Sequence, residues 1–197
     1  DGHFIGVIGD GANSMDTRQM FTAGVAVNSM AAQLLSAHTS SKLTPDSLIK
    51  MLQTTQATLA ADKRTADSET GLEHGKTTLS FVRSFPSEIP NQVRLIGANL
   101  GDSCIAYRLP GGQLAYLGKA ERAGSAAESG GDISGNTPFD ETAQKNLHCF
   151  DVNLPKGTEV FFLSDGTVDN VADAAALDAV FCCPAFDTIP KETCPWI

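Results

Sequence analysis

Four aspartates lie at positions in the sequence where their carboxylates could hold a metal ion. Asp10 and Asp165 each follow a short apolar run, Asp102 lies between two such runs, and Asp169 comes four residues after Asp165. A carboxylate at the end of a buried strand is costly to desolvate unless a positive charge meets it. Repulsion between neighbouring carboxylates adds to that cost. A hard cation bound by oxygen ligands would relieve both costs, and a water bridging two such ions can attack phosphorus.

The same Asp-Gly pairs also fit a simpler interpretation, in which each is a polar turn that closes a strand. For one pair taken alone, the turn is the better interpretation. Three strand ends that carry an Asp beside a Gly, and that could converge at one end of a sandwich of sheets, favour the metal site instead.

Other chemistries fit the sequence less well. The stretch 9–14 follows an apolar run as a dinucleotide-binding loop does, but its third glycine is replaced by Ser14. The stretch 71–77 is one residue too short between its glycines for a phosphate-binding loop. The four histidines lie in unrelated contexts, and no serine lies in a glycine-flanked nucleophile motif.

Composition narrows the class of protein further. The 197 residues carry a formal net charge of −9, and Lys and Arg are scattered, which argues against a nucleic-acid partner. We expect no membrane association, because no apolar run is long enough to cross a bilayer. The five cysteines form no compact framework, which indicates reduced thiols and an intracellular location, either cytoplasmic or organellar.

The elements that must position the aspartates follow from hydrophobic periodicity. We predict strands at 4–8, 77–83, 92–99, 148–152 and 159–163, with 160–163 buried on both faces, and a hairpin formed by 104–109 and 113–117. We predict a helix at 16–37, whose apolar positions are Phe21, Val25, Met30, Leu34 and Leu35. We also predict a helix at 45–61 with Thr44 as N-cap, and a helical segment at 172–181. The stretch 119–136 is rich in Ser, Gly and Ala and predicts a mobile loop. Strands grouped together after a helix pair indicate an α+β fold with antiparallel sheets.

Three segments resemble the metal-dependent protein serine/threonine phosphatases of type 2C. Residues 6–12 (GVIGDGA) resemble the family's first strand-end metal motif, 98–103 (ANLGDS) its Ala-Asn-x-Gly-Asp-Ser motif, and 161–170 (FFLSDGTVDN) its Leu-x-Ser-Asp-Gly-x-x-Asp motif. Residues 75–78 stand where the family begins a core strand, and 136–139 resemble a segment of a short branch that includes organellar phosphatases.

The resemblance implies one phosphatase-like domain over residues 1–197, an antiparallel β-sandwich flanked by antiparallel helices, which we expect to be incomplete at both ends. It implies that Asp10, Asp165 and the Gly11 carbonyl hold two Mg²⁺ or Mn²⁺ ions, with Asp102 and Asp169 at a third, weaker site. The substrate would be a phosphoprotein. Neither Asp178 nor Asp187 lies in the context of the family's last metal-binding aspartate. The alternative hypothesis is therefore an inactive pseudophosphatase that binds a protein partner in a larger assembly.

Overall fold

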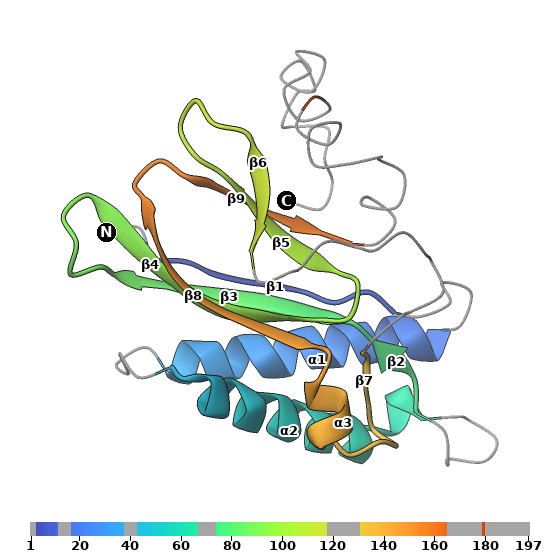
Figure 1. Cartoon of the computed structure of the whole chain (residues 1–197). Helices are drawn as coiled ribbons and strands as arrows, with labels where there is room; N and C mark the ends of the chain where they lie inside the picture. Colours follow the sequence, from blue (N-terminus) through green and yellow to red (C-terminus); the bar gives the residue numbers. More distant parts are fainter. Residues whose placement is uncertain are drawn as a thin grey trace.

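The computed structural model describes residues 3–11, 17–37, 43–66, 74–117, 131–164 and 179. The elements, in chain order (Figure 1), are β1 (Ile5–Ile8), α1 (Thr17–Ser36), α2 (Pro45–Ala61), the short 3-10 helix η1 (Lys63–Thr65), β2 (Lys76–Thr77), β3 (Leu79–Pro86), β4 (Gln92–Leu100), β5 (Cys104–Arg108), β6 (Leu114–Leu117), β7 (Ile133–Ser134), α3 (Glu141–Gln144), β8 (Leu147–Pro155) and β9 (Glu159–Leu163).

The described strands form two main antiparallel sheets. The four-stranded sheet has the order β1-β3-β4-β8 and the three-stranded sheet the order β6-β5-β9, while β2 and β7 form a separate two-stranded ribbon. Buried residues from both sheets form one cluster, to which the larger sheet contributes Val82, Leu95 and Phe150 and the smaller sheet Ile105 and Leu117. The two sheets therefore pack face to face, and the predicted antiparallel α+β class is confirmed.

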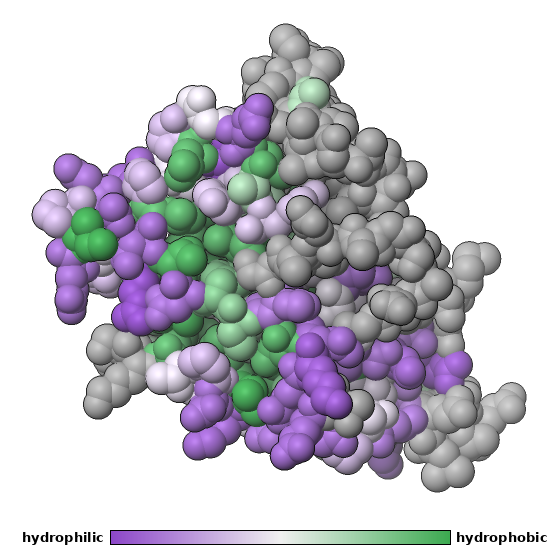
Figure 2. Space-filling view, viewed as in Figure 1, coloured by the Kyte–Doolittle hydropathy of each residue, from purple (hydrophilic) through white to green (hydrophobic). Residues whose placement is uncertain are grey.

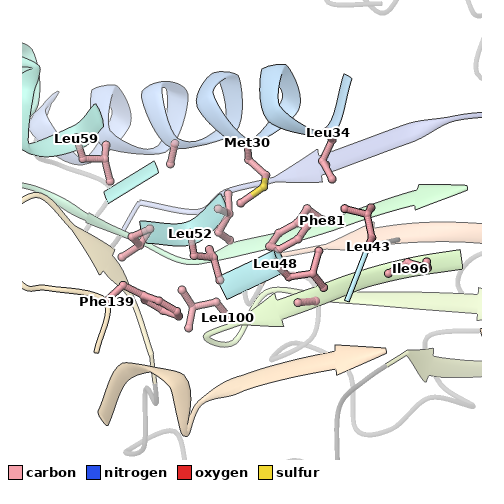
Figure 3. Packing of buried hydrophobic residues seen from close by; sticks show 14 of the residues in the cluster. Met30, Leu34, Leu43, Leu48, Leu52, Leu59, Phe81, Ile96, Leu100 and Phe139 are labelled. Carbon is pink, nitrogen blue, oxygen red and sulfur yellow. The ribbon is translucent and has the colours of Figure 1, made fainter. Parts of the chain in front are cut away.

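Helices α1 and α2 cover the other face of the four-stranded sheet (Figures 1 and 3). Met30 and Leu34 of α1, Leu52 of α2, Phe81 of β3 and Leu100 of β4 are fully buried in one cluster. Burying a side chain of this size contributes about 1.5–3 kcal/mol each. This layer holds α1 against the strands whose ends carry Asp10 and Asp102.

The face of α1 that turns inward matches the predicted one at Met30 and Leu34 and differs from it at two positions. Thr22, Ala26, Met30 and Leu34, spaced four residues apart, are completely buried. Phe21 and Leu35, which we expected among the apolar positions of this helix, are instead 47% and 61% exposed. The prediction failed at these two positions because one helix face receives only residues three or four apart, and both lie outside that stripe.

Arg83 of β3 lies against the C-terminal end of α1. It is buried, its Nη1 donates a hydrogen bond to the Leu34 carbonyl, and its guanidinium lies 5.1 Å from the centre of the Phe85 ring. Burial lowers the pKa of Arg83. Because α1 has no basic residue in its own last turn, Arg83 supplies the positive charge that favours a helix C-terminus.

The start of α2 is confirmed as predicted. Thr44 is the N-cap: its Oγ1 accepts a hydrogen bond from Ser47 N at 3.3 Å, and Ser47 Oγ accepts one from Thr44 N at 2.8 Å. Pro45 is the first helical residue, where its missing N–H costs nothing.

Thr44→Ala is expected to lower the free energy of unfolding by about 1 kcal/mol, because it leaves the Ser47 N–H without its capping acceptor. The control is Thr54→Ala, in the exposed middle of the same helix, where alanine is the better helix former. Urea unfolding followed by circular dichroism measures both. Equal losses in the two variants would contradict a capping role for Thr44.

Several strands differ in extent from their predictions. The hairpin of β5 and β6 and the strand β9 match the expected segments. The predicted strand 148–152 is in fact nine residues long (β8), and among the described strands it lies at the edge of its sheet. Strand β3 begins two residues later than expected. The prediction of a mobile loop at 119–136 is wrong at Ile133 and Ser134, because both residues are buried in β7, which pairs with β2.

The expectation that 160–163 is buried on both faces is only partly met. Phe162 packs toward the cluster between the sheets and Phe161 toward a second cluster on the outer face of the smaller sheet. Leu163 is buried, whereas Val160 to Phe162 are half-buried because β9 is an edge strand among the described residues. The predicted helical segment 172–181 lies outside the described residues, apart from residue 179.

The hydropathy of the visible surface differs between the strands and the helices. In Figure 2 the hydrophobic residues gather along the strands, whereas the surface over α2 and α3 is mostly hydrophilic. None of the helices in the described part of the chain combines the length and the apolar character that crossing a membrane requires.

Candidate metal centre

The ends of three strands meet at one end of the sandwich. Ile8, the last residue of β1, pairs with Ser80, and Ser80 also pairs with Asn99 near the end of β4. Cys104, at the start of β5, pairs with Leu163, the last residue of β9. The chain segments that carry Asp10 and Asp102 therefore leave their strands at the same end, next to the point where β9 leads toward Asp165.

Not every predicted ligand falls within the described residues. Asp10, Gly11 and Asp102 do, whereas Asp165 and Asp169 lie outside them. Within the described ranges, no three acidic, histidine or cysteine side chains converge as a complete metal site. The structure thus describes part of the predicted donor set, and the assignment of metal ligands stays a prediction.

The main chain of Asp10 is held by two threonines. Thr78 N donates a hydrogen bond to the Asp10 carbonyl at 2.9 Å, and Asp10 N donates one to Thr78 Oγ1 at 3.2 Å. Thr77 Oγ1 donates to the same carbonyl at 2.9 Å. Because both backbone groups of Asp10 are paired, its side chain projects from a fixed stretch of backbone.

Gly11 lies against the first turns of α1. A Cβ at this position would lie 2.7 Å from the Gln19 carbonyl oxygen and 3.0 Å from Gln19 Cβ, so only glycine fits. Gly11 also forms a β-bridge with Thr77. The Gln19 side chain reaches the same region, where its Oε1 accepts a hydrogen bond from Lys76 N at 2.5 Å.

The turn that carries Asp102 is held by Ser80 and Thr78, and Asn99 ties the two sheets together beside it. Ser80 Oγ donates a hydrogen bond to the Ser103 carbonyl at 2.8 Å, and Thr78 Oγ1 and Ser103 Oγ share one at 2.6 Å. Asn99 Nδ2 donates to the Leu117 carbonyl of β6 at 2.5 Å, which ties β4 to the smaller sheet. Gly101, which precedes Asp102, has a φ of +89°, a conformation that glycine adopts at little cost.

One buried oxygen at this end has no hydrogen-bond partner among the described residues. Asn99 is completely buried, and its Oδ1 accepts no hydrogen bond from the described part of the chain. The layer between the sheets is thus apolar at Leu95 and becomes polar at Asn99, Ser80 and Ser103, where the strands end.

Lys76 brings a positive charge to the same end of the molecule. Its Nζ lies 3.4 Å from Asp132 Oδ2; the Lys76 side chain is exposed and that of Asp132 is partly exposed. The sequence predicted no function for Lys76, Thr77, Thr78, Ser80 or Asn99. A signal was present in the two adjacent threonines directly before an apolar run, but no sequence pattern shows which backbone groups their hydroxyls contact.

The donors that this end offers fit a hard divalent cation. The predicted ligands that lie within the described residues would all donate oxygen atoms: Asp10 and Asp102 their carboxylates and Gly11 its backbone carbonyl. Oxygen is the ligand atom that Mg²⁺ and Mn²⁺ prefer, whereas zinc sites use mainly nitrogen and sulfur.

Comparisons with solved structures give the same fold. The chain is similar to the serine/threonine phosphatase PstP/Ppp of Mycobacterium tuberculosis, with a TM-score of 0.60 and 17% identity over 92% of this chain and 75% of that one. The catalytic domain of PstP in complex with two manganese ions matches at a TM-score of 0.52 and 20% identity, over the same shares of the two chains. A Stage II Sporulation E family protein from Thermanaerovibrio acidaminovorans matches at 0.51 and 19%, over 87% of this chain and 84% of that one.

Sequence comparison identifies the family. No curated protein gives a significant match to the chain. The family profile described as Protein phosphatase 2C matches residues 1–193, nearly the whole length, and includes all three motifs that carry the aspartates. This chain therefore belongs to the Protein phosphatase 2C family, a family of protein phosphatases and hence of hydrolases.

Proposed function

We propose that this protein is a metal-dependent hydrolase of phosphoserine and phosphothreonine in proteins. The observation that carries the proposal is the meeting of the Asp10 and Asp102 segments at one end of the sandwich, in a chain that matches the phosphatase family over residues 1–193. The PstP catalytic domain, which has this fold, binds two manganese ions, and this supports Mn²⁺ or Mg²⁺ as the cofactor here.

In this proposal Asp10, Asp165 and the Gly11 carbonyl hold two ions, and Asp102 and Asp169 hold a third, weaker one. Two bound divalent ions would supply a bridging hydroxide and neutralise charge on the phosphoryl oxygens. The protein holds its own ligand oxygens, those of Asp10 and Gly11, in place through the paired backbone of Asp10 and the close packing of Gly11 on α1. The described cysteines, Cys104 and Cys149, are free thiols, which supports an intracellular location.

The test is hydrolysis of a phosphothreonine peptide with millimolar Mn²⁺, compared with the same reaction after removal of the metal by EDTA. We expect hydrolysis that requires Mn²⁺ and that is lost in Asp165→Asn. Asp46→Asn, at an exposed position in the first turn of α2, is the matched control and should leave the rate unchanged.

Two outcomes would contradict the proposal. An Asp165→Asn variant as active as the unchanged protein would exclude this metal assignment. A protein that neither binds Mn²⁺ at millimolar concentration nor hydrolyses the peptide would instead favour the pseudophosphatase, a fold that serves as a binding or assembly module.

A further inference from the structure

Thr78 contacts both aspartate-bearing segments at the candidate metal centre. It lies between β2 and β3, and its backbone N–H and side-chain Oγ1 both bond to the backbone of Asp10. Its Oγ1 also shares a hydrogen bond of 2.6 Å with Ser103 Oγ, on the residue that follows Asp102. One side chain therefore connects the two motifs: Thr78 is 68 residues from Asp10 and 25 residues from Ser103 in the sequence.

The methyl group of Thr78 lies against Gly101, the residue before Asp102. A Cβ at Gly101 would lie 2.8 Å from Thr78 Cγ2, so the methyl group packs directly on the Gly101 backbone. Thr78 thus meets the residue before Asp102 with its methyl group and the residue after it with its hydroxyl. The turn that carries Asp102 is held between these two contacts.

A hydroxyl group is required for this arrangement. It can accept the Asp10 N–H in a lone pair and still exchange a hydrogen bond with Ser103 Oγ, because it has one proton and two lone pairs. Valine has almost the same shape but offers neither bond, and it would leave the half-buried Asp10 N–H without its partner. Serine keeps both bonds and loses only the methyl contact.

We propose that Thr78 is a positioning residue, which sets Asp10 and Asp102 relative to each other and thereby sets the affinity for metal. This inference rests on the proposed function, since it assigns Thr78 to the same site. Partners that orient metal ligands typically change metal affinity 10-fold to 100-fold when they are lost.

The experiment compares Thr78→Val and Thr78→Ser with the unchanged protein. Mn²⁺ affinity is measured by calorimetry, and amide hydrogen exchange is measured without metal at residues 9–11 and 101–104. Thr55→Val is the control, because the Oγ1 of Thr55 is also hydrogen-bonded, at 2.9 Å to Gln33 Nε2, but Thr55 is a buried residue of α2 that faces α1.

Thr78→Val is expected to bind Mn²⁺ roughly 10-fold to 100-fold more weakly and to exchange faster in both segments. Thr78→Ser should restore most of the affinity. Thr55→Val should lower stability without changing Mn²⁺ affinity, which separates positioning from a general loss of stability.

Unchanged Mn²⁺ affinity in Thr78→Val would overturn the inference, as would faster exchange in only one of the two segments. If the unchanged protein itself binds no Mn²⁺, the proposed function fails separately. Amide hydrogen exchange in Thr78→Val then decides whether Thr78 positions the two segments. Faster exchange in both segments supports this role, and exchange at the rate of the unchanged protein overturns it.

Discussion

Asp10→Asn is expected to lower Mn²⁺-dependent hydrolysis of a phosphothreonine peptide by more than roughly 100-fold, while the fold is retained. Loss of an outer partner of a metal ligand already costs 10-fold to 100-fold, and this change removes the negative charge of a ligand itself. The fold should survive because the structural contacts of Asp10 to Thr77 and Thr78 involve its backbone, which asparagine keeps. Steady-state rates at increasing Mn²⁺ measure the effect.

A graded comparison sharpens this test. Asp102→Asn should have a smaller effect than Asp10→Asn, because Asp102 is assigned to the third, weaker ion. Asp46→Asn removes a charge from the exposed start of α2 and should have no effect on the rate. Asp10→Asn with the activity of the unchanged protein would exclude Asp10 as a ligand, and a larger loss in Asp102→Asn would reverse the assigned order.

Gly101→Ala is expected to lower the free energy of unfolding by about 2–5 kcal/mol. The backbone at Gly101 has a φ of +89°, and a side chain in such a conformation costs about 1–2 kcal/mol. The added Cβ would also overlap the Gly131 carbonyl oxygen and lie 2.8 Å from Thr78 Cγ2. Overpacking of this kind typically costs about 1–3 kcal/mol more. Chemical denaturation measures the sum.

Gly111→Ala is the matched control for this prediction. Gly111 also has a positive φ, of +69°, but no atom lies within 4 Å of the position that its Cβ would take. The control therefore carries the backbone cost alone, about 1–2 kcal/mol. Equal losses in the two variants would show that the turn before Asp102 can relax, and would contradict its close packing on Thr78 and Gly131.

The sequence alone determined the local features of this protein. Apolar runs, each followed by an aspartate beside a glycine, located the strands that end just before Asp10 and Asp102, and Thr44-Pro45 located the start of α2 to the residue. These features follow from short-range effects: side-chain alternation, capping of the first helical N–H groups, and the fixed φ of proline. The motifs at these strand ends were sufficient to indicate the family.

Only the tertiary structure decided how these pieces meet. It paired Ile8 and Asn99 with the same residue of β3, exposed Phe21 and Leu35, extended β8 to nine residues and buried Ile133 in β7. It also placed Thr78 between the two aspartate-bearing segments. Pairing, register and burial depend on partners far away in the chain, and local periodicity carries no information about which partner a strand or a hydroxyl group will find.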